Sequence, residues 1–246
     1  MSDFPQFNRI KPCRHGLMMF NANDTIIRRS LDLYGEFSQG EAELFASLVR
    51  PGMVVIEVGA NIGAHTVQLA KAVGRAGLVV AFEPQRIVFQ TLCANLALNS
   101  LTNVNAFHLA VGAAPGSPLV PFLDYTKSNN FGGVDLGSDR TGEQVGVTTL
   151  GHGEKRSGRG ANLIAALRPL IYVENDRQDR SAELIRALDR LGYSMFWHKS
   201  PLINSGNFNG SAANVFGEMV SVNMLCVPRG PPRSDIVGDL QPVAVP

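Results

Sequence analysis

The sequence predicts an α/β protein built on a doubly wound, mostly parallel sheet. Two short apolar runs rich in β-branched residues, 53–58 (MVVIEV) and 78–82 (LVVAF), are typical of strands covered on both faces. Between them, residues 62–73 carry apolar side chains at helical spacing. The three segments predict one βαβ unit, and a glycine-bearing turn follows its first strand.

The alternation of strands and helices continues along the chain. A capping box, SQGE at 38–41, predicts the start of a helix over 41–49. In the second half, Ser181 is suited to the N-cap of a helix and Gly192 to its C-terminal stop. The other predicted elements are a helix over 86–99 and strands over 104–111, 169–175, 193–198 and 219–227.

Composition indicates a protein that acts on small molecules. The chain has 246 residues, of which 45% are hydrophobic and 17% charged, and its net charge is +1. So small a charge argues against nucleic acid or an anionic membrane as partner. No apolar run has the length of a membrane span, and the N-terminus lacks a signal-peptide pattern, so we expect a cytoplasmic protein.

The three cysteines, Cys13, Cys93 and Cys226, are far apart and accompanied by no cluster of histidines. This spacing argues against a disulfide framework and against a zinc site. We therefore expect reduced, mostly buried thiols and no bound metal.

Residues 34–228 are predicted to form the main domain. An N-terminal extension, 1–33, precedes it, and a flexible tail rich in proline and glycine, 229–246, follows it. Within the domain, residues 112–160 are rich in Gly, Ser and Thr. Two short strands are predicted there, over 119–123 and 144–150.

The turn after the first strand carries the main functional signal. It reads E-x-G-x-N-x-G, with Glu57, Gly59, Asn61 and Gly63, and Ala60 lies between Gly59 and Asn61. A dinucleotide fingerprint requires glycine where Asn61 stands, because the pyrophosphate approaches the backbone there. Glu57 would also repel a diphosphate, whereas the cationic end of a ligand would be attracted.

A second carboxylate completes the pattern. Glu83 ends the strand that follows, and Pro84 then turns the chain away. A carboxylate at this position can accept both ribose hydroxyls of a nucleoside. Singly, Glu57 could cap the turn and Glu83 could be a solvated acid, but together they favour adenosine with a cationic tail, as in S-adenosylmethionine.

In these residues the chain resembles the FkbM-like S-adenosylmethionine-dependent methyltransferases, which have a Rossmann-like class I methyltransferase fold. The resemblance implies a seven-stranded, mostly parallel sheet whose last strand is antiparallel. The resemblance lies over most of residues 20–228. It implies methyl transfer to oxygen, usually a hydroxyl of a sugar or other secondary metabolite. By position, it also implies that Ala110 and Val111 lie near the adenine and that Tyr34 and Glu36 come from a segment that closes over the cofactor. The matching stretches are 34–45, 54–70, 79–104, 108–112, 128–133, 167–176 and 222–228.

One departure from the family is evident. The family has a central strand that ends in Asp and Glu, followed by a helix, where this chain has 145–170. We expect that strand to be missing, or to be replaced by 144–150 (QVGVTTL). Residues 151–155 (GHGEK) could record a deletion with a reading frame shifted by one nucleotide. A catalytically impaired remnant of the fold is therefore one alternative function, and a nicotinamide-dependent oxidoreductase is another.

Few residues are candidates for binding the methyl acceptor or for removing its proton. Glu174, with Asp176 nearby, and His198 end predicted strands and could remove a proton from the acceptor. A histidine beside a tryptophan, as His198 is beside Trp197, is however more often a packed or solvent-facing side chain than a base. The loop 199–218 is rich in asparagine and could bind a small, hydroxylated acceptor, or it could be an ordinary surface loop. A homodimer is left open as the assembly.

Overall fold

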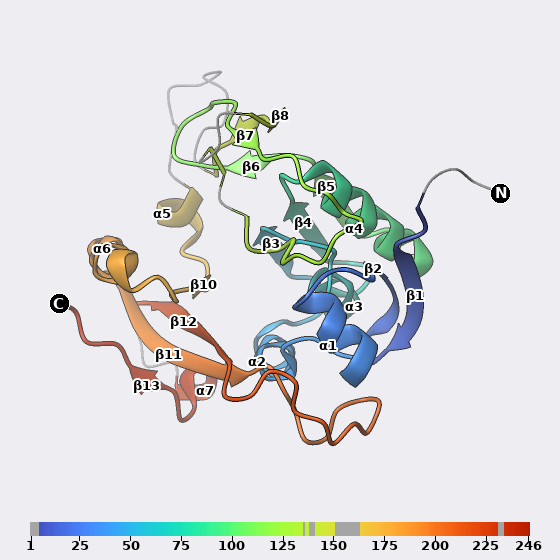
Figure 1. The fold of residues 1–246 in the computed structure, drawn as a ribbon. Helices are drawn as coiled ribbons and strands as arrows, with labels where there is room; N and C mark the ends of the chain where they lie inside the picture. The colour runs from blue at the N-terminus through green and yellow to red at the C-terminus, as the bar shows by residue number, and fades with distance from the viewer. Residues whose placement is uncertain (1–4, 135, 138–140, 151–162, 231–233) are drawn as a thin grey trace. The chain divides into compact units, whose positions relative to one another are not determined.

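The protein is described by a computed structural model over residues 5–134, 136–137, 141–150, 163–230 and 234–246 (Figure 1). Contacts divide the chain into two compact units. The first unit holds 1–149 together with 203–214, and the second holds 150–202 together with 215–246. Each unit has its own sheet and its own apolar core.

The first unit contains the predicted parallel sheet. Its strands β3 (Val54–Val58), β4 (Leu78–Phe82) and β5 (Val104–Phe107) lie in the order β3-β4-β5, all parallel (Figure 1). The helices α2 (Gln39–Leu48), α3 (Thr66–Val73) and α4 (Arg86–Leu98) accompany them. The βαβ prediction is confirmed, although α3 begins four residues later than expected.

Helix α3 packs on the sheet through a dense apolar cluster. Leu69, Ala70 and Val73 of the helix meet Val79 of β4, and all four side chains are at most 5% exposed. Burial of side chains of this size stabilises a fold by about 1.5–3 kcal/mol each. This cluster therefore fixes α3, and with it the turn that precedes the helix.

The segment predicted as one strand over 104–111 is two strands. After β5, His108 and Leu109 break the pairing, and β6 (Ala110–Val111) pairs in parallel with β9 (Val147–Thr148) instead of with β4. The imidazole Nε2 of His108 lies 2.9 Å from the carbonyl oxygen of Pro84. A further short pair joins β7 (Leu119–Val120) and β8 (Glu143–Gln144).

The segment 144–150 does not replace the missing central strand. Gln144 pairs with β7 and residues 147–148 pair with β6, but no residue of the segment pairs with β3, so the predicted substitution is wrong. Over the described residues, β3 pairs with β4 alone, which leaves its other edge without a neighbour. On the same strand, Val54, Ile56 and Val58 are 65%, 39% and 53% exposed. Residues 151–155, which carry the reading-frame hypothesis, lie outside the described residues.

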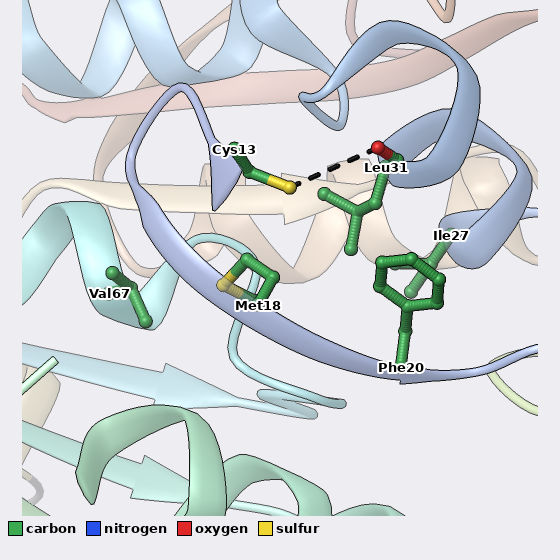
Figure 2. Packing of buried hydrophobic residues seen from close by; sticks show 6 residues of the cluster. All are labelled: Cys13, Met18, Phe20, Ile27, Leu31 and Val67. Atoms are coloured by element: carbon green, nitrogen blue, oxygen red, sulfur yellow. Dashed lines mark hydrogen bonds between the residues drawn. The ribbon is translucent and has the colours of Figure 1, made fainter. Parts of the chain in front are cut away.

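The N-terminal extension forms ordered elements that the sequence analysis did not predict. A hairpin of β1 (Asn8–Cys13) and β2 (Gly16–Asn21) is followed by α1 (Ile27–Tyr34). Side chains from the hairpin, α1 and α3 form one buried cluster, in which the thiol of Cys13 faces the carbonyl oxygen of Leu31 (Figure 2). Its members are Cys13, Met18, Phe20, Ile27, Leu31 and Val67.

A fully buried asparagine ties the hairpin to the sheet unit. Asn95 of α4 accepts the backbone N–H of Met19 at 2.6 Å and donates to the Met19 carbonyl at 2.9 Å. The same amide nitrogen donates to the Ile62 carbonyl at 2.8 Å. Asn95 therefore connects β2 with the turn that follows β3.

The second unit contains the predicted reversed last strand. Strand β12 (Val220–Pro228) lies between β10 (Ile171–Glu174) and β11 (Tyr193–Pro201) and runs antiparallel to both. Helix α6 (Gln178–Arg190) packs against this sheet through Ile185 and Leu188, and a short α5 (Leu163–Leu167) precedes β10. The antiparallel last strand of the predicted fold is confirmed.

Several local predictions need correction. Helix α6 begins three residues before Ser181, with Arg177 as its N-cap, whereas Gly192 does end it with a positive φ of 79°. The tail is not wholly irregular, because it forms α7 (Ser234–Val237) and β13 (Gln241–Pro242), and β13 pairs with β11. Cys13 and Cys226 are buried as expected, but Cys93 is exposed.

The capping box at 38–41 is also wrong in detail. Helix α2 does begin there, but Ser38 adopts a left-handed conformation and makes no side-chain bond to the helix backbone. Its hydroxyl instead donates to Glu41 Oε1 at 2.8 Å. In the part of the chain that the structure describes, no helix has the length and apolarity that crossing a bilayer requires.

Candidate functional site

The turn after β3 has the backbone shape that its glycines predict. Gly59, Asn61 and Gly63 all have positive φ, at 75°, 50° and 84°. Glycine adopts this conformation without strain, and asparagine tolerates it better than most residues. A Cβ at Gly59 would meet no atom within 4 Å, whereas one at Gly63 would lie 2.6 Å from Leu92 Cδ1. Gly59 therefore leaves space beside the turn, and Gly63 permits close packing.

Glu83 lies at the carboxyl end of β4 and holds this turn. Its Oε2 accepts the backbone N–H of Asn61 at 2.9 Å, and its Oε1 accepts that of Gln85 at 2.8 Å. The side chain is only 3% exposed, and this burial raises the pKa of the carboxyl to about 7, against the lowering effect of the two N–H donors. The charge of Glu57 raises this pKa further.

Glu57, at the end of β3, accepts a hydrogen bond from the helix that follows the turn. The Thr66 hydroxyl, on the first residue of α3, donates to Glu57 Oε2 at 2.7 Å. Burial raises the pKa of the Glu57 carboxyl, while the Thr66 hydroxyl and the charge of His65 lower it. Two carboxyl groups of raised pKa thus flank the turn, and each influences the charge of the other site.

These groups fit a nucleoside with a cationic tail better than a phosphate ligand. The partners of Glu57 and Glu83 in the described residues are a hydroxyl and backbone N–H groups. A carboxylate can accept further hydrogen bonds from ribose hydroxyls, because each oxygen has two lone pairs. The Asn61 side chain lies against the backbone at Gly132, where a Cβ would be 2.6 Å from Asn61 Nδ2. Asn61 thus carries an amide side chain where a dinucleotide fingerprint has glycine.

The neighbouring predicted residues occupy defined positions. Ala60 is 3% exposed, and its N–H bonds the carbonyl of Phe82, as does that of Gly59. The Pro84 carbonyl contacts His108, as described above. Ala110 is buried in the β6–β9 pair, with Val111 beside it. Their contact with adenine stays a prediction.

Two residues that the sequence analysis left aside form another wall of the turn. Tyr125 and Phe131 have ring centroids 4.8 Å apart, and the Phe131 carbonyl accepts the side chain of Gln85 at 2.7 Å. Tyr125, Phe131 and Asn61 line one cavity of ≈ 20 Å³, which has room for about one water. Asp24 lies at the same cavity and accepts the N–H of Phe131 at 3.3 Å.

The sequence signal for this wall was the segment 128–133 (SNNFGG), one of the stretches that resemble the family. Asn129 of this segment exchanges backbone hydrogen bonds with Asn23 and Thr25. The segment is therefore fixed to the end of the hairpin, more than 100 residues earlier in the chain, which spacing alone could not predict.

Tyr34 and Glu36 are buried, with exposed fractions of 0% and 3%. The Tyr34 hydroxyl donates to the Ala213 carbonyl at 2.8 Å. Glu36 accepts hydrogen bonds from Arg14, Asn204 and Phe208. Both residues thus contact the segment 203–214, and their predicted contact with the cofactor stays a prediction.

The two predicted catalytic residues lie in the second unit, in one row across its sheet. Glu174 of β10 and His198 of β11 both pair with Asn223 of β12, from its two sides. Residues directly opposite one another in antiparallel strands share a face. The Tyr172 hydroxyl lies 2.7 Å from His198 Nδ1, a contact that orients the imidazole. Such an orienting partner is a common feature of a general base.

Glu174 also lines a groove of ≈ 430 Å³, a size typical of small-molecule sites. The groove lies between the end of β10 and the first turns of α6, and both acidic and basic side chains face it. The polar residues of its lining are Glu174, Asn175, Asp176, Arg177, Arg180 and Glu183. No group of three His, Cys, Asp or Glu side chains that could hold a metal occurs in the described ranges.

The asparagines expected to bind the acceptor are engaged within the first unit. Asn204 donates to Glu36 and Asn209 to the Leu33 carbonyl. Asn207 is 5% exposed, and its side-chain amide bonds the backbone of Asn204 and Ser211. For these three side chains, the structure shows a role in holding the loop.

The part of the chain that contains the turn is similar to a known protein family. Residues 57–161 match the methyltransferase FkbM domain. The resemblance that the sequence predicted is confirmed over these residues, which include the turn, Glu57, Glu83 and the segment 128–133. The match supports S-adenosylmethionine as the cofactor and S-adenosylmethionine-dependent methyl transfer as the general reaction.

Several solved methyltransferase structures are similar to the chain at low identity. M. jannaschii TYW2 in complex with AdoMet is 16% identical over 93% of this chain and 90% of that chain, with a TM-score of 0.43. A SAM dependent methyltransferase from Aquifex aeolicus is 15% identical over 83% and 93%, with a TM-score of 0.39. A protein-L-isoaspartate O-methyltransferase is 29% identical with a TM-score of 0.26, but the match covers 27% of this chain and 22% of that enzyme. No curated protein matches the chain.

Proposed function

We propose that the protein transfers the methyl group of S-adenosylmethionine to a hydroxyl oxygen of a small acceptor, such as a sugar or another secondary metabolite. The observation that carries the cofactor half of this proposal is the pair of carboxyls of raised pKa around the turn, Glu57 and Glu83. Glu83 is bonded to the turn itself through the Asn61 N–H, so a ligand that reaches Glu83 must lie against Gly59 and Asn61.

In this proposal Glu83 holds the ribose hydroxyls and Glu57 faces the amino-acid end of the cofactor. Hydroxyl donors stabilise an ionised carboxylate, which offsets the burial that raises the pKa of Glu83. The open space beside Gly59 allows a ligand to approach the backbone. When bound, the cofactor supplies an electrophilic methyl group, so the protein has to align the acceptor and remove its proton.

For the acceptor, the proposal rests on the second unit. Glu174 and His198 are the candidate bases, and the groove beside Glu174 is large enough for a monosaccharide-sized molecule. His198 is held by Tyr172, which fixes one ring nitrogen and thereby the direction of the other. An acceptor that donates several hydroxyls suits the carboxylates and amide of this groove.

Calorimetric titration with S-adenosylhomocysteine and with NAD, under identical conditions, tests the cofactor assignment. We expect binding and thermal stabilisation with S-adenosylhomocysteine only; at 100 times Kd a ligand stabilises by about 2.7 kcal/mol. Stabilisation by NAD alone would favour the oxidoreductase instead. Methyl transfer from isotope-labelled S-adenosylmethionine to a panel of sugars then tests the acceptor, and an alkali-stable methyl ether in the product is the expected result.

A second candidate is a binding module that retains the cofactor site without catalysis. It is favoured by the single pairing of β3 in the described residues and by the exposure of Val54 and Val58. S-adenosylhomocysteine binding without transfer to any hydroxylated acceptor, amine or thiol would support this candidate over the enzyme.

A further inference from the structure

Part of the connection between β11 and β12 belongs to the first unit. Both strands belong to the second unit, whereas residues 203–214 group with residues 1–149. We name residues 203–214 the strap. Its hydrogen bonds to that unit converge on residues 33–36, at the end of α1 and just after it.

Glu36 is the centre of this attachment. Its Oε1 accepts the Asn204 amide at 3.0 Å, and its Oε2 accepts the Phe208 backbone N–H at 3.0 Å. Oε2 also accepts Nε of Arg14 at 2.6 Å, and the same guanidinium donates to the Gly206 carbonyl at 2.6 Å. A carboxylate that is 3% exposed therefore receives three donors, two of them from the strap. Charge-assisted hydrogen bonds of this kind are about twice as strong as neutral ones.

The backbone of Tyr34 and Gly35 also contacts the strap. The Asn209 N–H donates to the Tyr34 carbonyl at 3.1 Å. Gly35 has a positive φ of 69°, and a Cβ there would lie 2.7 Å from Phe208 Cδ1. The attachment therefore depends on a backbone conformation and a space that only glycine provides.

A short series of contacts leads from Glu36 to the cofactor turn. Phe37 follows Glu36, and its ring centroid lies 5.8 Å from that of His65. The imidazole Nε2 of His65 lies 3.5 Å from Glu41 Oε2. The next residue, Thr66, donates to Glu57. Displacement of the segment around Glu36 would thus shift Thr66, the first residue of the helix after the turn.

We propose that Glu36 is a positioning residue that couples the order of the strap to cofactor affinity. The coupling part of this inference rests on the proposed function, because it assumes that Glu57 and Glu83 bind the cofactor. Coupling is reciprocal, so a cofactor that stabilises the turn also stabilises the strap, and release of the strap weakens cofactor binding by the same factor.

Glu36→Gln is the test variant, because it keeps the shape of the side chain and replaces one oxygen by a donor. An amide cannot accept from both sides, so at least one of the donors from Arg14, Asn204 or Phe208 would face an NH₂ group. Glu43→Gln on α2, at an exposed position, is the matched control for loss of one negative charge. Far-ultraviolet circular dichroism checks that each variant is folded.

Hydrogen exchange of the full chain and calorimetry with S-adenosylhomocysteine provide the two readouts. In Glu36→Gln we expect the amides of Phe208 and Asn209 to exchange at least about tenfold faster than in wild type, and Kd for S-adenosylhomocysteine to rise about three- to tenfold. In wild type the ligand should slow exchange of the same amides. Glu43→Gln should match wild type in both readouts.

Unchanged exchange of Phe208 and Asn209 in folded Glu36→Gln would overturn the attachment role of Glu36. Faster exchange with an unaltered Kd would overturn the coupling. If wild-type protein binds no S-adenosylhomocysteine, the proposed function and the coupling both fail, whereas the attachment role is still decided by exchange in the absence of ligand. Failure of the two proposals is therefore distinguishable.

Discussion

Asn61 donates its backbone N–H to the carboxylate of Glu83 at 2.9 Å, so the turn after one strand is bonded to the acid at the end of the next. Parallel strands bring their carboxyl ends to one edge of the sheet, which is where such a bond can form. Because this bond uses a backbone donor, the conformation of the turn and the ionisation of Glu83 depend on each other.

Affinity for S-adenosylhomocysteine should rise with pH. Ribose hydroxyls are bound best by ionised Glu83, and the pKa of this carboxyl is about 7 in the ligand-free protein. If the ligand lowers that pKa by about one unit, Kd falls about fivefold between pH 6 and pH 8. Calorimetry over this range checks the slope. Glu83→Gln should bind at least about tenfold more weakly with a flat profile, whereas Glu143→Gln should keep the wild-type slope; a pH-independent wild-type Kd would count against the role of Glu83.

The same pKa predicts how stability depends on pH without ligand. The folded-state value of about 7 lies above the ordinary 4.5, so the folded protein holds this proton more tightly than the unfolded chain does. The contribution is fully present below pH 4.5 and is lost as pH rises through about 7. Its size is on the order of 3 kcal/mol. In urea unfolding, the free energy of unfolding should fall more between pH 5 and pH 8 for wild type than for Glu83→Gln. Equal decreases in the two proteins would contradict the raised pKa of Glu83.

The two glycines of the turn should respond differently to alanine. In Gly59→Ala only the positive φ of 75° opposes the new side chain, because its Cβ meets no atom within 4 Å. We expect a loss of about 1–2 kcal/mol in stability and a larger loss of S-adenosylhomocysteine binding, because the Cβ enters the space left for the ligand. Gly63→Ala combines strain with a contact of 2.6 Å to Leu92 and should lower the unfolding free energy more. Thermal unfolding and calorimetry of both variants separate the two effects, and equal binding by Gly59→Ala and wild type would place the ligand elsewhere.

Thr66 should stabilise the ionised form of Glu57. Its hydroxyl donates at 2.7 Å and is fully buried, so Thr66→Val leaves the shape of the side chain but removes the donor. A hydrogen bond to a charged group contributes about 1.5–3 kcal/mol. Burial raises the pKa of Glu57, so the loss should be greater at pH 8, where more of the carboxyl is ionised, than at pH 5. Denaturant unfolding measures the loss of unfolding free energy, and Thr66→Ser is the control variant that keeps the hydroxyl. An equal loss at both pH values would show that the hydrogen bond to ionised Glu57 is not its cause.

The parts of the fold that the sequence predicted are those with continuous local signals. The β-branched run at β4 predicted its bounds correctly, and the acid that ends it was recognised from its position alone. The break at His108 was missed because it depends on the pairing of β6 with β9, a segment far along the chain. The hairpin was missed although Gly16, with a φ of 148°, closes its turn. The attachment of the strap to Glu36 joins residues 168 or more positions apart, and no spacing rule predicts such a pair.

Asp24 should support the wall of the cofactor turn as well as helix α1. One carboxylate oxygen accepts the N–H groups of Ile26 and Arg28 at 2.9 and 3.0 Å, and the other accepts that of Phe131 at 3.3 Å. Asp24→Ala removes both acceptor oxygens, and with them all three hydrogen bonds, and should cost about 1–2 kcal/mol or more of stability, the usual cost of losing a helix cap. Asp24→Asn retains one carbonyl oxygen, which can cap the helix while its amide faces Phe131. We therefore expect Asp24→Asn to preserve most of the stability but to speed hydrogen exchange at Phe131. If Asp24→Asn instead exchanges like wild type at Phe131, the bond from Asp24 is not what holds this wall beside Asn61.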